Sequence, residues 1–192
     1  MIVTIHQPNF MPWFPFFQKM ECADIFIVLR YCQFRKNNFQ NRFNLNNKWH
    51  TMSIQQGLDL IINKKYVTPI KDWNNIKKSL AAYESILNEF DNCISESHSE
   101  TNTAIINKIA SILKIKTKIV LDYETHLTAT ERLIKLCIDN GANTYLAGLS
   151  GRKYLDLTLF ERENIKVVFQ DESLIKRTPI LEVLKKHYSE QY

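Results

Sequence analysis

Short apolar runs and amphipathic stretches alternate along this chain of 192 residues. Runs rich in β-branched and other apolar residues predict buried strands at residues 2–6, 25–31, 118–122, 144–148 and 165–170. Apolar residues that recur every three or four positions predict helices at residues 14–23, 72–90, 100–114, 129–140 and 179–188. Strands that alternate with helices in this way predict an α/β fold with a mostly parallel sheet flanked by helices.

Residue types at the ends of two helices support these limits. Asp72 is the expected N-cap of the first long helix. Thr128 and Glu131 have the spacing of a capping box, and Asn140-Gly141 is a typical helix end.

A polar segment interrupts the strand and helix pattern in the first half of the chain. The Asn46-Asn47 pair between alternating residues predicts a β-hairpin, and residues 55–71 have no clear pattern. We therefore expect an insert at about 32–115 that forms the hairpin and a helical subdomain. The chain has no repeat, low-complexity tract or linker, which predicts one continuous domain over residues 1–192.

The first loop, HQPNFMPW, follows a strand and is restricted by its prolines. In a parallel sheet it lies at the carboxyl edge, where ligands bind, so His6, Gln7 and Asn9 are candidate site residues. His6 is a candidate general base, and the alternative is that it only fixes the turn through a loop carbonyl. Trp13 is a candidate for stacking on a substrate ring, although packing is the alternative.

The second polar segment, CQFRKNNFQNR, comes directly after the second strand and crowds hydrogen-bond donors on the same edge. Gln33, Lys36, Asn41 and Arg42 are candidate ligands of a phosphate or carboxylate group. The interleaved phenylalanines are also compatible with single-stranded nucleic acid, but an ordinary hairpin with one buried face explains them more simply.

The third segment, YLAGLSGRKYLD, leads from a strand into a turn, and we expect a helix to begin near Arg152. Backbone amides of such a turn bind anions, so Gly148, Ser150, Gly151, Arg152 and Tyr154 are candidate substrate-binding residues. The signal is weak, because the segment lacks the phosphate-loop and dinucleotide fingerprints. The spacing around Ser150 also does not fit a nucleophile elbow.

The charge is unevenly distributed. The net charge is +5, yet residues 30–78 contain ten basic and two acidic residues, a local excess of eight positive charges. The remaining residues carry an excess of three negative charges. A solvated basic face is one explanation, and a local anionic small-molecule ligand is the other.

Composition excludes several protein classes. With 45% hydrophobic residues, 4 Gly and 5 Pro, the chain is neither disordered nor collagen-like. Four cysteines without a close pair predict reduced thiols and neither a disulfide framework nor a metal site. No apolar run is long enough to span a membrane and no export signal is recognisable, so we expect a cytoplasmic protein.

Together the three polar segments resemble the WbqC-like protein family. The resemblance lies in IHQPNFMPWFPFFQKMECADIFIVL (5–29), CQFRKNNFQNRF (32–43) and ANTYLAGLSGRKYLDLTLFERENIKVVFQ (142–170). It implies that the family-pattern positions are His6, Gln7, Pro8, Pro12, Gln33, Lys36, Asn41, Arg42, Gly148, Gly151 and Tyr154. The chain departs from the pattern at Arg30 and Tyr31, where family members usually carry acidic residues, and in a shorter C-terminal region.

The resemblance also implies a role in bacterial surface-polysaccharide (O-antigen) biosynthesis. The first hypothesis is a transferase that moves an acyl or aminoacyl group onto an amine of a nucleotide-linked sugar, with His6 as the base. An ATP-dependent ligase or nucleotidyltransferase is the second, although the first loop lacks a second histidine. A non-catalytic module that binds a sugar nucleotide or a partner enzyme is the third. The sequence identifies no cofactor, leaves a homo-oligomer open and does not favour a nucleic-acid partner.

Overall fold

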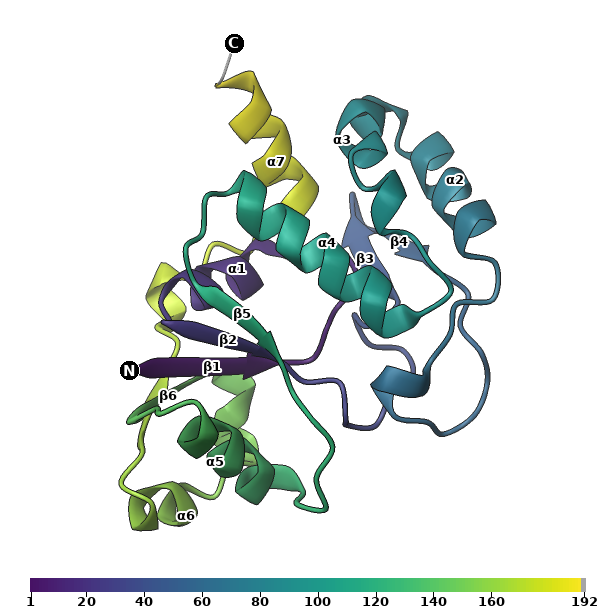
Figure 1. The fold of residues 1–192 in the computed structure, drawn as a ribbon. Coiled ribbons are helices and arrows are strands. Elements are labelled where there is room, and N and C mark those ends of the chain that lie inside the picture. The colour runs from purple at the N-terminus through teal and green to yellow at the C-terminus, as the bar shows by residue number, and fades with distance from the viewer. Residues whose placement is uncertain (191–192) are drawn as a thin grey trace.

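A computed structural model describes residues 1–190 and has a five-stranded parallel sheet at its centre (Figure 1). The strand order is β5-β2-β1-β6-β7, and every neighbouring pair is parallel. The strands are β1 (Ile2–His6), β2 (Ile25–Val28), β5 (Lys118–Leu121), β6 (Thr144–Ala147) and β7 (Lys166–Phe169). This confirms the expected α/β class, with β1 in the middle of the sheet.

Helices cover both faces of the sheet (Figure 1). One face carries α1 (Phe14–Glu21), α4 (His98–Ile112) and α7 (Ile180–Ser189), and the opposite face carries α5 (Ala129–Asp139) and α6 (Leu157–Arg162). Phe26 and Val28 point toward α1 and α4, whereas Ile25 and Ile27 point toward α5. This alternation is the period of a strand, and it divides the apolar core into two layers.

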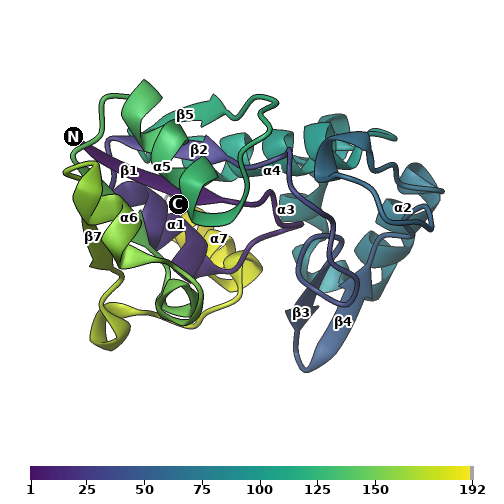
Figure 2. The same cartoon turned by 90° about the horizontal axis from the view of Figure 1, so that it is seen from below.

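A separate antiparallel hairpin, β3 (Arg42–Leu45) and β4 (Lys48–Thr51), lies beyond the carboxyl ends of the sheet strands (Figure 2). Asn46 and Asn47 form its turn with φ of 54° and 60°, as the sequence predicted. Asparagine tolerates this left-handed conformation better than most residues, which is why the pair sets the turn. The segment between β2 and β5 also contains α2 (Pro69–Ser79), α3 (Glu84–Asn88) and α4.

The expected helix over 72–90 is wrong in two respects. The segment breaks at Leu80 into α2, a 3₁₀ turn (Ala81–Tyr83) and α3. Asp72 is not an N-cap, because it lies inside α2, where its carboxylate accepts a hydrogen bond from the Ser53 backbone N at 2.7 Å. The remaining 3₁₀ turns are Ile61–Asn63, Asp91–Cys93, Leu149–Lys153 and Glu172–Leu174.

The expected capping box of α5 is also absent. Thr128 occupies the N-cap position, but its side chain makes no capping hydrogen bond. Two other helices do have side-chain caps: in α4 the Ser97 hydroxyl accepts from the backbone N of Glu100, and in α6 the Asp156 carboxylate accepts from the backbone N of Thr158.

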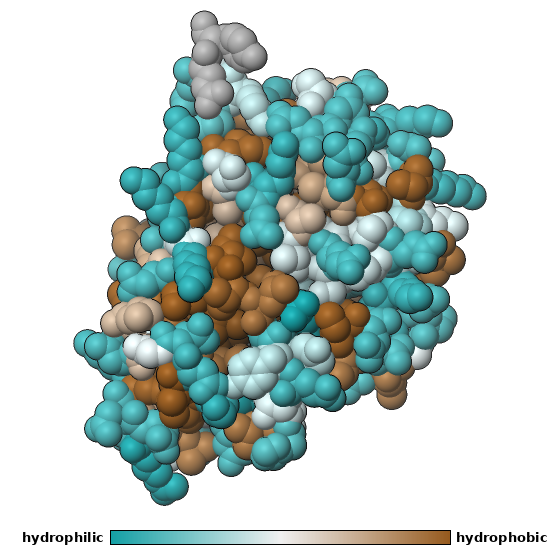
Figure 3. All heavy atoms as spheres, in the orientation of Figure 1, coloured by the Kyte–Doolittle hydropathy of each residue, from teal (hydrophilic) through white to brown (hydrophobic). Residues whose placement is uncertain are grey.

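Strand β5 forms one edge of the sheet. Figure 3 shows apolar side chains over this edge and mainly hydrophilic ones over the surrounding helices. Leu121 is exposed there, whereas Ile119 and Val120 are half-buried. Across residues 1–190, no helix has both the length and the apolar character needed to cross a bilayer.

Candidate functional site

The strands β1 and β6 separate at their carboxyl ends. Backbone pairing between them is limited to Ile2 with Thr144 and Val3 with Tyr145, although β1 continues to His6 and β6 to Ala147. On its other side β1 stays paired with β2 as far as His6. From this point the connections between strands run in opposite directions, from β1 to β2 on one side and from β6 to β7 on the other. Ligands of α/β proteins bind at such a position.

Side chains satisfy the backbone groups that this separation leaves without strand partners. The Thr4 hydroxyl donates to the Leu146 carbonyl at 2.7 Å. The Ile5 carbonyl faces the same side of β1 as the Met1 carbonyl, which accepts from the Thr144 N. Instead of a β6 amide, it accepts a hydrogen bond from the Lys19 ammonium at 3.2 Å.

Lys19 comes from the buried face of α1 and is only 3% exposed. Among residues 1–190, no carboxylate lies within ion-pair distance of its ammonium group. Burial disfavours the charged form and lowers the pKa of Lys19 to about 7. Lys19 is therefore an amine shielded from solvent and, within the described part of the chain, without a carboxylate partner, and near pH 7 it is divided between its neutral and its charged form. The signal in the sequence is a lysine at an apolar position of FPFFQKME, which periodicity alone does not assign to a site.

His6 lies at the end of β1 beside Lys19. Its ring packs edge-on against Phe16 of α1, with 4.8 Å between the ring centroids. Nδ1 lies 2.9 Å from the Gln7 carbonyl oxygen and donates to it, which leaves the lone pair of Nε2 available. Burial, and next the charge of Lys19, lower the pKa of His6 to about 3, so its imidazole is neutral at pH 7.

Gln7 links the loop after β1 to the loop after β2. Its amide nitrogen donates to the Cys32 sulfur at 3.2 Å, and its amide oxygen accepts from the Gln40 side chain at 2.5 Å. Burial raises the pKa of Cys32 to about 11, so this thiol stays protonated and does not act as a thiolate nucleophile. Gln7 therefore orients the two loops against each other.

A buried polar network fixes the next part of the first loop. The Asn102 amide donates to the Pro8 carbonyl at 2.8 Å and to the Gln40 carbonyl at 2.7 Å. His98 also donates to the Gln40 carbonyl, and the Tyr66 hydroxyl donates to the Asn102 oxygen. Through these contacts α4 and the segment after β2 hold the loop that follows His6.

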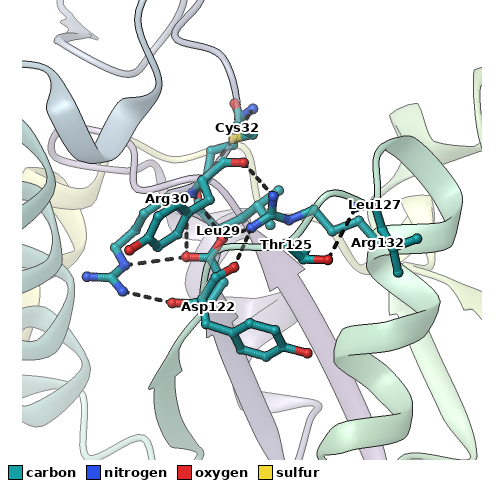
Figure 4. Close-up of polar contacts among 10 residues, drawn as sticks. Leu29, Arg30, Cys32, Asp122, Thr125, Leu127 and Arg132 are labelled. Carbon is teal, nitrogen blue, oxygen red and sulfur yellow. Dashed lines mark hydrogen bonds and ion pairs between the residues drawn. The ribbon is translucent and has the colours of Figure 1, made fainter.

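The carboxyl ends of β2 and β5 are joined by Asp122, which the sequence did not single out for a role (Figure 4). Its carboxylate, 2% exposed, accepts from the backbone N of Arg30 at 2.9 Å and of Tyr31 at 3.0 Å. It also forms ion pairs with Arg132 at 2.8 Å and Arg30 at 3.4 Å. Arg132 in turn donates to the Tyr31 carbonyl at 2.6 Å. Arg30, which was counted among the cations of the basic segment, therefore also stabilises the fold.

The positive charge of residues 30–78 does not form one surface. Lys64 is 1% exposed, and its ammonium donates to the Gln55 and Gly57 carbonyls and to Asp59. Lys77 pairs with Asp91, outside the counted segment, at 2.7 Å. Several of the cations that made the segment basic therefore hold loops and helices together.

The remaining candidate site residues of the first two polar segments lie partly near the carboxyl edge of the sheet and partly in or beside the β3–β4 hairpin. Asn9 is nearly buried, and Gln33 and Lys36 are exposed. The Asn41 amide nitrogen donates to the Met52 carbonyl at 2.8 Å. Arg42 belongs to β3, where it donates to the Asn37 carbonyl at 2.5 Å.

The Gly148 turn follows the carboxyl end of β6, the strand next to β1, which ends at His6. A Cβ at Gly148 would meet nothing within 4 Å, whereas one at Gly151 would lie 2.9 Å from the Leu155 side chain. Ser150, Arg152 and Tyr154 are exposed. The expected helix near Arg152 is wrong, because a 3₁₀ turn occupies Leu149–Lys153 and α6 begins at Leu157 with Asp156 as its N-cap. Among residues 1–190, no cluster of side chains is suited to a metal ion.

Removal of the Asp122 charge tests the link between β2 and β5. Asp122→Asn leaves the buried Arg132 without a counter-ion, and we expect a loss of about 3–5 kcal/mol of unfolding free energy in urea titrations. The matched control is Asp139→Asn, which breaks the partly exposed pair with Lys135 and should cost less than about 1 kcal/mol. Equal losses in the two variants would contradict the structural role of Asp122.

Burial of Lys19 predicts a pH dependence of stability. The pKa of Lys19 is about 7 in the folded protein against 10.5 as the ordinary value, so between these values the unfolded chain binds more protons. Stability therefore rises with pH in this window, by up to about 1.4 kcal/mol per pH unit. Denaturation at pH 7 to 9 should show that Lys19→Met loses this increment, whereas the exposed-site variant Lys116→Met retains it. If the unfolding free energy changed with pH equally in Lys19→Met and in the unsubstituted protein, the lowered pKa of a buried Lys19 would be excluded.

Comparison with known proteins agrees with the resemblance of the three segments. A protein of Mycobacterium tuberculosis named "Uncharacterized protein Rv1507c" is 28% identical over 188 residues, covering 88% of this chain and 81% of that protein. No solved structure matches the chain. The model of the WbqC-like protein family matches residues 7–178, which include most of the sheet and the loops around Lys19 and His6. The chain therefore belongs to the WbqC-like protein family.

Proposed function

We propose that this chain is a transferase of surface-polysaccharide precursor synthesis, which moves an acyl or aminoacyl group onto the amine of a nucleotide-linked amino sugar. The observation that carries the proposal is the pair of Lys19 and His6 at the point where β1 and β6 separate. Within residues 1–190, one group is a buried lysine amine with no carboxylate partner, and the other is a neutral imidazole whose Nε2 makes no hydrogen bond. An anion-binding group beside a proton acceptor is what such a reaction needs.

Lys19 is suited to an anionic part of the substrate, either a phosphate of the sugar nucleotide or an acyl-donor phosphate. A buried ammonium binds an anion strongly, because little water screens the interaction and the charged hydrogen bond is short. The Gly148–Gly151 turn and Arg152 follow the carboxyl end of β6, the strand next to β1. We assign them, with Lys36 and Arg42, to the remaining charges and polar groups of the substrate.

His6 would accept the proton of the attacking amine. The amine nitrogen attacks the acyl carbonyl carbon, a C–N bond forms, and the bond from that carbon to the donor oxygen or sulfur breaks. His6 Nε2 takes the proton from the amine and passes it to the departing group. Asn9, Gln33 and the Asn41 amide oxygen would orient the amine.

Substrate binding would also adjust His6 for this role. Burial is the main cause that lowers the pKa of His6, and the charge of Lys19 is the second. An anion bound to Lys19 offsets that charge, so the pKa of His6 rises when substrate is present. A stronger base therefore forms only in the complex.

The strand order favours a second candidate, an ATP-dependent ligase or nucleotidyltransferase. In order of appearance the five strands are arranged 3-2-1-4-5, as in the first five strands of dinucleotide-binding sheets. This argument rests on the fold alone and names no reacting group, and folds of this kind carry many chemistries. It remains the second candidate for that reason.

Substitution of the two residues should separate binding from chemistry. With UDP-linked amino sugars and acyl-coenzyme A donors, followed by mass spectrometry, we expect His6→Gln to lower kcat by about 10²–10⁴-fold with little change in Kd. Lys19→Met should raise Kd by about tenfold or more, since it removes a charged hydrogen bond. The control is His126→Gln, an exposed residue outside the site.

The outcomes are distinct. Unchanged turnover in His6→Gln would contradict its assignment as the base. Sugar-nucleotide binding without turnover of any donor would favour the non-catalytic module, and consumption of ATP in the presence of magnesium would favour the ligase.

A further inference from the structure

Three aromatic side chains outside the Lys19 and His6 pair border one groove. Trp13, Phe39 and Trp49 are 44%, 42% and 43% exposed, whereas large aromatic residues at a protein surface are usually scattered. The groove they border has a volume of about 280 Å³ and lies between the β3–β4 hairpin and the start of α7. We call it the aromatic groove.

The exposed rings are held in place by their neighbours. Trp13 and Phe39 are nearly parallel, at 8°, with 6.3 Å between ring centroids, and Phe39 lies 5.5 Å from Trp49. The Arg42 guanidinium lies over the Trp49 ring at 4.2 Å. The Phe39 carbonyl accepts from the Phe10 backbone N at 2.9 Å, which attaches this part of the groove to the first loop. Preformed ring surfaces of this kind bind planar ligands with little loss of conformational freedom.

The aromatic groove adjoins the proposed site through α1. Trp13 is the N-cap residue of this helix, and Lys19 is located in its second turn. Six residues correspond to about 9 Å along a helix axis. The groove and Lys19 therefore lie about 9 Å apart along the axis of one helix, which is the spacing that a single ligand with a ring and a diphosphate would have to span.

The chemistry of the lining distinguishes a nucleobase from a sugar ring. Apart from Asn44 and Arg177, the described residues that line the groove are apolar or aromatic, and none of them carries a carboxylate. A pyranose presents hydroxyl groups around its whole rim and needs several polar partners when it is buried. A base has two apolar faces for stacking and a polar edge, for which the Asn44 amide supplies both a donor and an acceptor.

The charges around the groove complement a phosphate. Arg42 stands beside Trp49, and Arg177 lines the groove, where it makes an exposed ion pair with Glu172 at 3.1 Å. An exposed pair of this kind is weak, so Arg177 can turn to a phosphate at little cost.

We propose that the aromatic groove binds the base of a nucleotide, with the ring against Trp13 and Phe39 and the phosphates directed toward Lys19. The inference rests on the proposed function for the identity of the whole ligand, a nucleotide-linked sugar. It adds the part of the protein that recognises the nucleoside.

Intrinsic fluorescence offers a direct test. The chain has three tryptophans, of which Trp13 and Trp49 border the groove and Trp73 is 2% exposed in the core. Titration with UMP, CMP, AMP and GMP should quench the two groove residues for at least one nucleotide. Ribose 5-phosphate, which lacks a base, should leave the fluorescence unchanged.

Two substitutions locate the binding surface. Trp13→Leu and Phe39→Leu should each raise Kd for the quenching nucleotide by about 5–150-fold, measured by calorimetry, because each removes a stacking surface. Both side chains are exposed, so the variants should fold, and Tyr123→Leu is the matched control at an exposed aromatic site on the sheet edge.

Failure of this inference differs from failure of the transferase proposal. If no nucleotide quenches, or if both groove variants bind as tightly as Tyr123→Leu, the groove is not the base site, even when His6-dependent transfer is observed. If ribose 5-phosphate binds as tightly as the nucleotides, base recognition is likewise overturned. If nucleotides bind through Trp13 and Phe39 but no donor is turned over, the base site stands and the transferase proposal fails.

Discussion

The limited pairing between β1 and β6 is the constraint on which the rest of the site depends. Two strands that pair for only two residues leave buried carbonyl groups without amide partners, and such groups must be satisfied. Thr4 satisfies the Leu146 carbonyl, and Lys19 satisfies that of Ile5. The position of the Lys19 ammonium group follows from this separation, and its charge adds to the burial that lowers the pKa of His6. A continuous ladder would leave no role for a lysine at this depth.

Helix α1 connects the two places to which we assign substrate. Its buried face carries Lys19 and Phe16, which contact β1 and His6, and its N-cap residue borders the aromatic groove. The segment between β2 and β5 contributes from the other side. It supplies Phe39, just before β3, and Trp49 of β4, and Asn102 with Gln40 fixes the loop between β1 and α1. A shift of this segment would therefore change the groove and the position of His6 together.

Sequence patterns predicted the parts of the fold that short-range physics determines. The β1 strand, the hairpin turn at Asn46-Asn47 and the alternation of strands and helices were correct, because local periodicity and backbone preference decide them. The break at Leu80 and the true role of Asp72 depend on tertiary contacts, and sequence periodicity does not report them.

For the same reason, counting charges overestimated how many cations of the basic segment are available to a ligand. Arg30 pairs with a residue 92 positions away, and Lys64 is buried. Lys19 was visible only as a lysine on an apolar helix face, and its importance depends on how β6 lies beside β1.

Measurement of the Lys19 titration by NMR, with and without a bound nucleotide sugar, tests the central claim most directly. The ε-carbon and ammonium signals of Lys19, identified by their absence in Lys19→Met, report the protonation of this group alone. The account predicts a pKa of about 7 in the free protein and a clear rise toward the ordinary range when the anionic ligand binds. An ordinary lysine pKa in the free protein, or a pKa that does not move when UDP-sugar is bound, would contradict it.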